Sequence, residues 1–154
     1  MKNIVLTRID DRLIHGQVVV SWIPFTKANE IIIIDKEYVN DAFMIRLIKQ
    51  AAPENIVVHV FSVSDAADYL KQSDDGSRIL ILSRYIENID ELIKLNIPIE
   101  KLNIGGLGSA LGRKKYLNSI HLSEKELSIL KEFTHKNIVV EIKMLPNDKV
   151  TSVL

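Results

Sequence analysis

Short apolar runs rich in β-branched residues alternate along this chain with stretches of helical periodicity. Several of the runs are almost continuously apolar, as strands covered on both faces of a sheet must be, and Ile31 to Ile34 is the clearest case. The sheet is therefore expected to be mostly parallel. The six predicted strands are Ile4–Thr7, Ile31–Asp35, Val57–Ser62, Ile79–Ser83, Leu102–Ile104 and Ile138–Lys143.

The segments between the strand runs carry helix signals. Asn40 is a candidate N-cap for a helix that Pro53 closes. Phe43, Leu47 and Ala51 repeat at helical spacing within it. Three further helix starts are indicated by Ser64, by Asn88 with Glu91, and by the capping-box pair Ser123 and Glu126.

The order of these elements, strand then helix throughout, predicts an α/β fold. We expect a single open doubly wound, mostly parallel sheet with helices on both faces, in one domain over residues 1–154. The glycine-bearing, basic stretch from Gly105 to Lys115 is expected to be a loop, and its role stays open.

The composition narrows the function classes. Of 154 residues, 47% are hydrophobic and 26% are charged, a globular balance that excludes disordered and fibrous classes. Twenty basic and twenty acidic residues cancel, so no bulk field attracts nucleic acid or anionic lipid. Any phosphate chemistry must come from a local site, and no nucleic-acid partner is expected.

The chain has no cysteine, which excludes disulfides, thiolate catalysis and cysteine-based metal sites. No histidine pair has zinc spacing and no carboxylate cluster indicates magnesium, so no metal is expected. The N-terminus reaches charged residues too early for a signal-peptide core, and no apolar run is long enough to span a membrane. We expect a cytoplasmic protein.

The segment after Thr7 concentrates the chemistry. It reads Arg-Ile-Asp-Asp-Arg-Leu-Ile-His-Gly-Gln, which places two guanidiniums, two carboxylates and an imidazole between a strand and a helix. Ligands of open α/β sheets bind outside the carboxyl ends of the strands, where this segment is expected to lie. Gly16 would let the backbone come close, and a helix through Val18 and Trp22 would point free N–H groups at the loop. The pattern predicts an anion site.

Within this segment, Arg8 and Arg12 offer planar forks suited to phosphate oxygens, and His15 is the neutral nucleophile. Asp10 or Asp11 could hold the proton of one ring nitrogen, so that the other nitrogen faces an incoming phosphorus. Which nitrogen that is stays open. In the alternative interpretation Asp11 and Arg12 form a surface ion pair and His15 merely starts a helix, but the crowding of charge types favours function.

The string Arg-Ile-Asp-Asp-Arg-Leu-Ile-His-Gly-Gln-Val at residues 8–18 resembles the active-site signature of one protein family. The members of this family are the enzyme IIB subunits of the mannose, fructose and sorbose family of the bacterial sugar phosphotransferase system. The resemblance extends over nearly the whole chain and is weaker from Leu107 to Tyr116. Similar residues include Asp35, Ala52-Pro53, Asn103 to Gly106, and Ser123 to Glu126.

The resemblance implies a protein-N(pi)-phosphohistidine–sugar phosphotransferase, IIB component. Its histidine would accept a phosphoryl group from a phosphohistidine on subunit IIA and donate it to a sugar held by membrane subunits IIC and IID, without a cofactor. The sugar and a homo-oligomeric state stay open. Carried over by position, the catalytic residues are His15, Arg12, Asp10 and Asp11. Arg8, Gly16 and Gln17 of the same segment are expected to bind the substrate.

Two alternative functions belong to other classes of protein. One is a regulatory module that uses the same loop as a reversible phosphate sensor. The other is a nucleotide-binding domain, but the spacing of Gly106, Gly108 and Gly112 is one residue too long for the dinucleotide fingerprint and follows a late strand.

The remaining charged and aromatic residues have structural interpretations. The basic cluster from Arg113 to Lys115 is either a solvated surface or a rim that contacts a partner or phosphate oxygens. Trp22 is expected to pack on the sheet. His59, His121 and His135 are expected to be structural.

Overall fold

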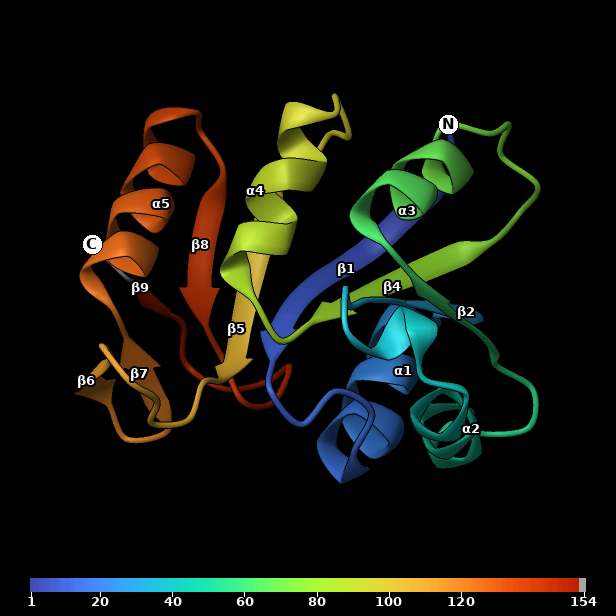
Figure 1. Cartoon of the computed structure of the whole chain (residues 1–154), viewed down its shortest axis with the longest axis horizontal. Coiled ribbons are helices and arrows are strands. Elements are labelled where there is room, and N and C mark those ends of the chain that lie inside the picture. The colour runs from blue at the N-terminus through green and yellow to red at the C-terminus, as the bar shows by residue number, and fades with distance from the viewer. Residues whose placement is uncertain (153–154) are drawn as a thin grey trace.

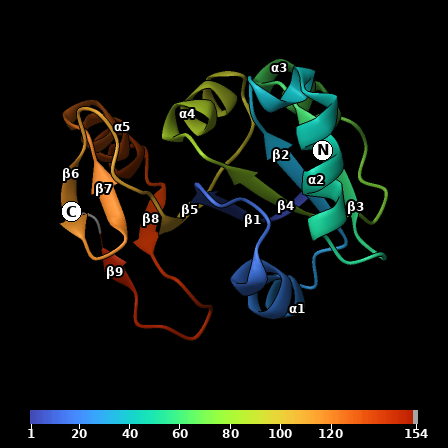
Figure 2. The ribbon, with the colours of Figure 1, turned by 60° about the horizontal axis from the view of Figure 1, so that its bottom comes forward.

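The computed structural model describes residues 1–152, which form a seven-stranded sheet flanked by helices (Figure 1). The strand order is β3-β2-β4-β1-β5-β8-β9, and all neighbours are parallel except β8 and β9. Beside it lies the antiparallel β6–β7 hairpin, next to α5 (Figure 2). The strands are β1 (Asn3–Asp10), β2 (Glu30–Ile34), β3 (Val57–Phe61), β4 (Arg78–Ser83), β5 (Lys101–Gly106), β6 (Lys114–Leu117), β7 (Ile120–Leu122), β8 (Val139–Ile142) and β9 (Thr151–Ser152).

Helical segments follow most strands. Among residues 1–152, none combines the length and the apolarity that crossing a membrane requires. The helical segments are the π-helical η1 (Val18–Trp22), α1 (Ile23–Thr26), the 3-10 turn η2 (Tyr38–Asn40), α2 (Ala42–Ala51), α3 (Val63–Leu70), α4 (Ile86–Lys94) and α5 (Glu124–His135).

The helices cover both faces of the sheet. Helices α3, α4 and α5 lie over one face, and α1 and α2 lie on the other (Figure 1). The isoleucines of β2 serve both cores: Ile32 and Ile34 face α3, whereas Ile31 and Ile33 pack with residues of η1, α1 and α2. All four are fully buried. This two-sided burial is the reason that the strand is continuously apolar and not alternating.

The carboxyl ends of the central strands meet at one edge of the sheet. Ser83, at the end of β4, pairs with Ile9 of β1 and with Ile34 of β2. The segment after β1 leads into η1 and α1 on one face, while those after β4 and β5 lead to α4 and α5 on the other (Figure 1). Such divergence between neighbouring strands creates the crevice in which ligands of α/β proteins bind.

All six predicted strands and their mostly parallel arrangement are confirmed. The end of β1 differs from the prediction, because Arg8, Ile9 and Asp10 belong to the strand and not to the loop. Ile9 pairs with both neighbouring strands, which extends the ladder past Thr7. The strands β6 and β9 were not predicted, and the segment from Gly105 to Lys115, expected to be a loop, begins in β5 and ends in β6.

Two predicted helix caps are displaced by one or two residues. Asp41 and not Asn40 is the N-cap of α2, and Ser62 and not Ser64 is the N-cap of α3. An N-cap needs an extended backbone with a side chain that accepts a first-turn N–H, and Asp41 and Ser62 meet both requirements. Asn40 lies in the η2 turn instead.

Asn88 was expected to open a helix, but it lies inside α4, whose N-cap is Tyr85. Its buried amide donates to the Ile34 carbonyl at 3.2 Å and to Ser83 Oγ at 3.1 Å, tying α4 to the ends of β2 and β4. The capping box of Ser123 and Glu126 at the start of α5 is confirmed.

Candidate active site

A buried carboxylate organises the segment after β1. Asp10 is fully buried at the end of the strand. Its Oδ1 accepts from the backbone N–H and from Nε of Arg12, both at 3.1 Å, and its Oδ2 lies 2.9 Å from Nε2 of His15 and 3.3 Å from Nη2 of Arg8. Burial by itself would raise the pKa of Asp10, but the hydrogen bonds from Arg12 and His15 outweigh it and hold that pKa below its ordinary value. Asp10 is therefore a carboxylate at neutral pH.

The ring of His15 is oriented by this carboxylate. A carboxylate only accepts hydrogen bonds, so Nε2 carries the hydrogen and a neutral ring keeps its lone pair on Nδ1. The side chain is 15% exposed. The His15 carbonyl accepts the N–H of Val19 at 3.0 Å, so His15 stands at the start of the helical turn that continues into η1. The backbone of His15 thus stands at the positive end of a helical segment.

Gly16 and Gln17 begin that helical turn. A Cβ at Gly16 would meet no atom within 4 Å, so the glycine leaves open space beside the histidine and is not required by packing. Gln17 Oε1 accepts from Arg12 Nη2 at 3.2 Å.

Arg12 is the exposed guanidinium of the site. Its side chain is 45% exposed although Nε and Nη2 both bond to Asp10. The turn between Arg12 and the histidine passes through Leu13, which is buried and has a φ of 55°. A left-handed Leu is costly, and the surrounding packing must hold it there. The turn lets the side chains of Arg12 and His15 converge on the same carboxylate.

Arg8 occupies a different place from the one expected. Its side chain is fully buried under Asp10, where it bonds to Asn103 Oδ1, to the Lys143 carbonyl at 2.8 Å and to the Met144 carbonyl at 3.3 Å. Burial lowers the pKa of Arg8. With no exposed surface, this guanidinium does not reach a phosphate at the protein surface. The expected direct contact between Arg8 and phosphate oxygens is therefore wrong.

Gly105 provides the space for Arg8. A Cβ at this position would overlap the guanidinium, so only glycine fits there without displacing Arg8. Trp22 closes the other side: its ring centroid lies 5.0 Å from Arg8 Cζ, and its Nε1 donates to the Met144 carbonyl.

Asp11 is not the carboxylate beside the histidine. Its Oδ2 accepts the N–H of Gly108 at 2.7 Å, and its own N–H donates to the Gly106 carbonyl at 3.0 Å. The alternative surface ion pair of Asp11 with Arg12 does not form, because Arg12 pairs with Asp10. The first part of the segment from Gly105 to Lys115 therefore clamps the histidine loop, a role that the sequence left open.

The basic cluster after this clamp divides into two parts. Arg113 is tied down by two bonds to Glu126, at 2.9 and 3.0 Å, and by one to the Gly108 carbonyl. Lys114 and Lys115 are exposed on β6. Only the two lysines are therefore available as a charged rim.

Sequence reasoning missed Arg84, which directly follows β4 at the same edge. Its Nε donates to Asp35 Oδ2 at 2.7 Å, and its guanidinium stacks over Tyr38 with Cζ 4.0 Å from the ring centroid. The only signal in the sequence is its place one residue after a buried strand, which is where functional side chains of such sheets occur.

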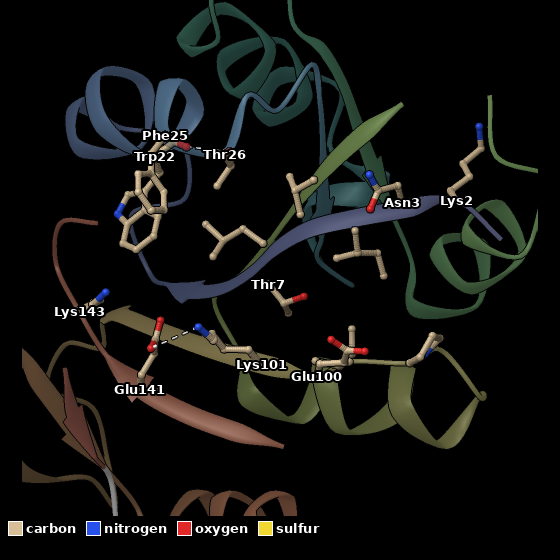
Figure 3. A pocket seen from close by; sticks show the side chains of 15 residues that line it. Lys2, Asn3, Thr7, Trp22, Phe25, Thr26, Glu100, Lys101, Glu141 and Lys143 are labelled. Carbon is tan, nitrogen blue, oxygen red and sulfur yellow. Dashed lines mark hydrogen bonds and ion pairs between the residues drawn. The ribbon is translucent and has the colours of Figure 1, made fainter. Parts of the chain in front are cut away.

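A hollow of about 510 Å³ lies elsewhere. Figure 3 shows it on the sheet surface between α1 and strands β5 and β8, with Trp22 and Phe25 on one side and the Lys101–Glu141 ion pair on the other. It is lined by neither Arg12 nor His15. Within residues 1–152 no three histidine, cysteine or acidic residues are grouped as metal ligands would be.

Comparisons with known proteins identify the family of this chain. The family model described as "PTS system sorbose subfamily IIB component" matches residues 4–154. A fructose-specific EIIB component of Bacillus subtilis is 32% identical over 149 residues, covering 96% of this chain and 91% of the relative. A mannose-specific EIIAB component of Escherichia coli is 30% identical over 144 residues, covering 93% of this chain and 45% of the relative.

A solved structure gives the same fold. The IIBSor domain of the sorbose permease from Klebsiella pneumoniae superimposes with a TM-score of 0.92 at 27% identity, covering 99% of this chain and 94% of that chain. The chain therefore belongs to the sorbose-type IIB components of the phosphotransferase system, domains that take part in phosphoryl transfer during sugar uptake.

Proposed function

We propose that His15 takes up the phosphoryl group in this chain and passes it on. The observation that carries the proposal is the 2.9 Å contact between His15 Nε2 and the buried Asp10, which leaves the Nδ1 lone pair for phosphorus. Components of this family work with a IIA and a membrane IIC component. The donor is then a phosphohistidine on IIA. The name of the mannose-specific relative, EIIAB, indicates that it carries both components in one chain.

The transfer has two steps. In the first, His15 Nδ1 forms a bond to phosphorus while the N–P bond of the donor breaks, and the donor imidazole leaves with that electron pair. In the second, a sugar hydroxyl presented by membrane subunits IIC and IID forms an O–P bond, the N–P bond of His15 breaks, and the hydroxyl proton goes to a base of the acceptor complex. Throughout both steps Asp10 accepts the hydrogen bond from Nε2 and stabilises positive charge on the ring.

The other site residues act on charge and position. Arg12 is exposed beside His15, and its guanidinium binds phosphoryl oxygens as their charge spreads in the transition state. Backbone N–H groups of Gly16 and Gln17 at the helix start add an anion-binding surface. Arg8 acts through Asp10 as a positioning residue, and Asp11 holds the loop.

This mechanism needs no metal or diffusible cofactor, because positioning and charge supply what phosphoryl transfer requires. The proposed location is the cytoplasm, with contact to the membrane only through the partner subunits. The activity is that of a protein-N(pi)-phosphohistidine–sugar phosphotransferase, IIB component.

The test is phosphorylation by a cascade driven by phosphoenolpyruvate, followed by alkaline mass spectrometry to locate the modified residue. We expect a single acid-labile phosphoryl group on His15. Transfer onward to a sugar in the presence of the membrane subunits separates a carrier from the alternative of a regulatory phosphate sensor. A modified residue other than His15 would overturn the assignment.

A further inference from the structure

Arg84 lies beside the histidine loop but has no part in the transfer described above. Ser83 pairs with Ile9 on one side and with Ile34 on the other, so the residue after it emerges between Asp10 and Asp35 at the same edge. The two guanidiniums at this edge that are not fully buried therefore stand on neighbouring strand ends, Arg12 after β1 and Arg84 after β4.

The Arg84 side chain is held in one orientation. Nε donates to Asp35, a fully buried carboxylate whose other oxygen accepts the N–H groups of Glu37 and Tyr38. The guanidinium lies over the ring of Tyr38, and Cζ is 5.0 Å from the ring centroid of Tyr85. A guanidinium fixed in this way loses little conformational entropy when it binds an anion.

Beyond Nε, this guanidinium makes one long ion pair with Glu37 and, among the described residues, no hydrogen bond. Within residues 1–152 only Nε makes a hydrogen bond, and Nη2 is buried without a hydrogen-bond partner, 3.7 Å from the nearest carboxylate oxygen of Glu37. Buried donors without acceptors are rare because each costs about 1–3 kcal/mol. Nη2 itself is covered, but the side chain as a whole is 17% exposed and Nη1 is not among the buried atoms, so an acceptor from outside can approach the guanidinium at Nη1.

A hollow of about 180 Å³ lies against Arg84, between the histidine loop and α2. Its walls are mostly apolar, and Leu47 at its outer side is 43% exposed. The volume is that of one side chain and not of a domain surface. The lining residues are Asp11, Arg12, Leu13, Ile14, Tyr38, Met44, Leu47, Ile48, Ala51 and Arg84.

We propose that this hollow is a socket for one carboxylate side chain of the protein that donates the phosphoryl group to His15, with Arg84 as its anion-binding residue. The inference rests on the proposed function. The apolar walls suit the methylene groups of an aspartate or glutamate, and the free donor edge suits its carboxylate. Asp11 in the lining repels a doubly charged phosphoryl group more strongly than a singly charged carboxylate, and Arg12 already stands beside His15.

The test compares Arg84→Gln with wild type using two phosphoryl donors. Phosphoramidate is a small donor with no docking surface, whereas the phosphorylated IIA protein must dock. We expect the KM for the donor protein to rise about tenfold with little change in kcat, as for the loss of one charge-assisted hydrogen bond. The rate with phosphoramidate should stay unchanged.

Two further variants make the result decisive. Arg46→Gln removes the same charge from an exposed position on α2 and should leave the KM for the donor protein near wild type. Leu47→Asp places a carboxylate on the exposed side of the hollow, where it repels the carboxylate of the donor protein. This variant should raise the KM for the donor protein even if Arg84→Gln fails to fold.

The outcomes separate the two proposals. If wild type is labelled on His15 and neither socket variant changes the KM for the donor protein, the socket is refuted and the proposed function stands. An equal loss of kcat with both donors in Arg84→Gln would show contact with the phosphoryl group, which also overturns the socket. If neither donor labels His15 in wild type, the proposed function itself fails, and the socket fails with it.

Discussion

Two histidines of this chain each bond to a carboxylate through Nε2, but they lie in different parts of the fold. His15 Nε2 lies 2.9 Å from Asp10 Oδ2 at the carboxyl ends of the strands. His59 Nε2, on β3, lies 2.6 Å from Oε1 of Glu30, the first residue of β2. The pKa of Glu30 is also lowered: burial alone would raise it, but hydrogen bonds from Tyr69 and His59 among others outweigh that effect. A histidine–carboxylate pair therefore does not by itself define a reactive site.

The surroundings separate the two pairs. His59 stacks on Phe61 with the ring centroids 4.9 Å apart, and Tyr69 donates to the same Glu30 carboxylate. His15 has instead an exposed guanidinium, a helix start and a neighbouring glycine that leaves open space. Aromatic packing stabilises the fold around His59, whereas the surroundings of His15 suit an anion.

The largest expected difference is in phosphoryl acceptance. His15→Ala should lower labelling by at least about a thousandfold, because the nucleophile is gone, and the protein should stay folded. His59→Ala should still be labelled and lose stability. Labelling is measured by intact-mass spectrometry at alkaline pH, with His121→Ala and His135→Ala as controls. Labelling of His15→Ala at the wild-type level would show that His15 is not the phosphoryl acceptor.

The two carboxylates should also differ, but less strongly than the two histidines. Asp10→Asn should slow transfer by about a hundredfold, because the amide no longer orients the ring. It should also destabilise the fold by about 3 kcal/mol, since Arg8 stays buried without its carboxylate. Glu30→Gln should leave transfer unchanged. Rapid-quench kinetics and urea denaturation measure the two effects, and equal transfer losses in both variants would argue against a special role for Asp10.

A smaller effect is expected at the guanidinium beside His15. Arg12→Lys keeps the charge but loses the planar fork, so transfer should slow by about tenfold while stability changes little. Arg78→Lys is the matched control, because Arg78 binds backbone carbonyls near the other edge of the sheet. Single-turnover rates with the donor protein measure the effect. Rates equal to wild type would show that Arg12 only holds the conformation of the loop and does not bind the phosphoryl group.

Acid should weaken both pairs together. The pKa values of Asp10 and Glu30 are lowered in the fold from ordinary values of 3.8 and 4.5. Near the ordinary pKa values the unfolded chain binds more protons than the folded protein. The stabilisation by the two ionised carboxylates is therefore present above the ordinary pKa values and is lost as pH falls through the lower pKa values of the folded state. We expect the urea midpoint to fall between about pH 5 and pH 3, and to fall less steeply in Asp10→Asn and in Glu30→Gln. Unchanged slopes in both variants would show that other carboxylates govern acid unfolding.

The sequence predicted the sheet more accurately than the site. Continuous apolar runs such as Ile31 to Ile34 have few other interpretations, so the strands were found. Arg8 was misplaced because a charged residue next to other charged residues looks like a loop, and only the long-range ladder and the space at Gly105 show that it is buried. The choice between Asp10 and Asp11 also needed the third dimension, because Gly108 holds Asp11 from 97 residues away.

The smallest effect is expected at the rim formed by Lys114 and Lys115 on β6. If this rim contacts the donor protein, charge reversal at both lysines leaves His15 and Asp10 intact and changes only the encounter. Phosphorylation by the donor should slow by roughly threefold at low salt, and the difference should shrink at high salt because screening removes the long-range attraction. Charge reversal at Lys71 is the control, since that exposed lysine follows α3 at the other edge of the sheet. Rates equal to wild type across the salt range would exclude β6 from the docking surface and confine partner recognition to the histidine loop and the neighbouring face of α2.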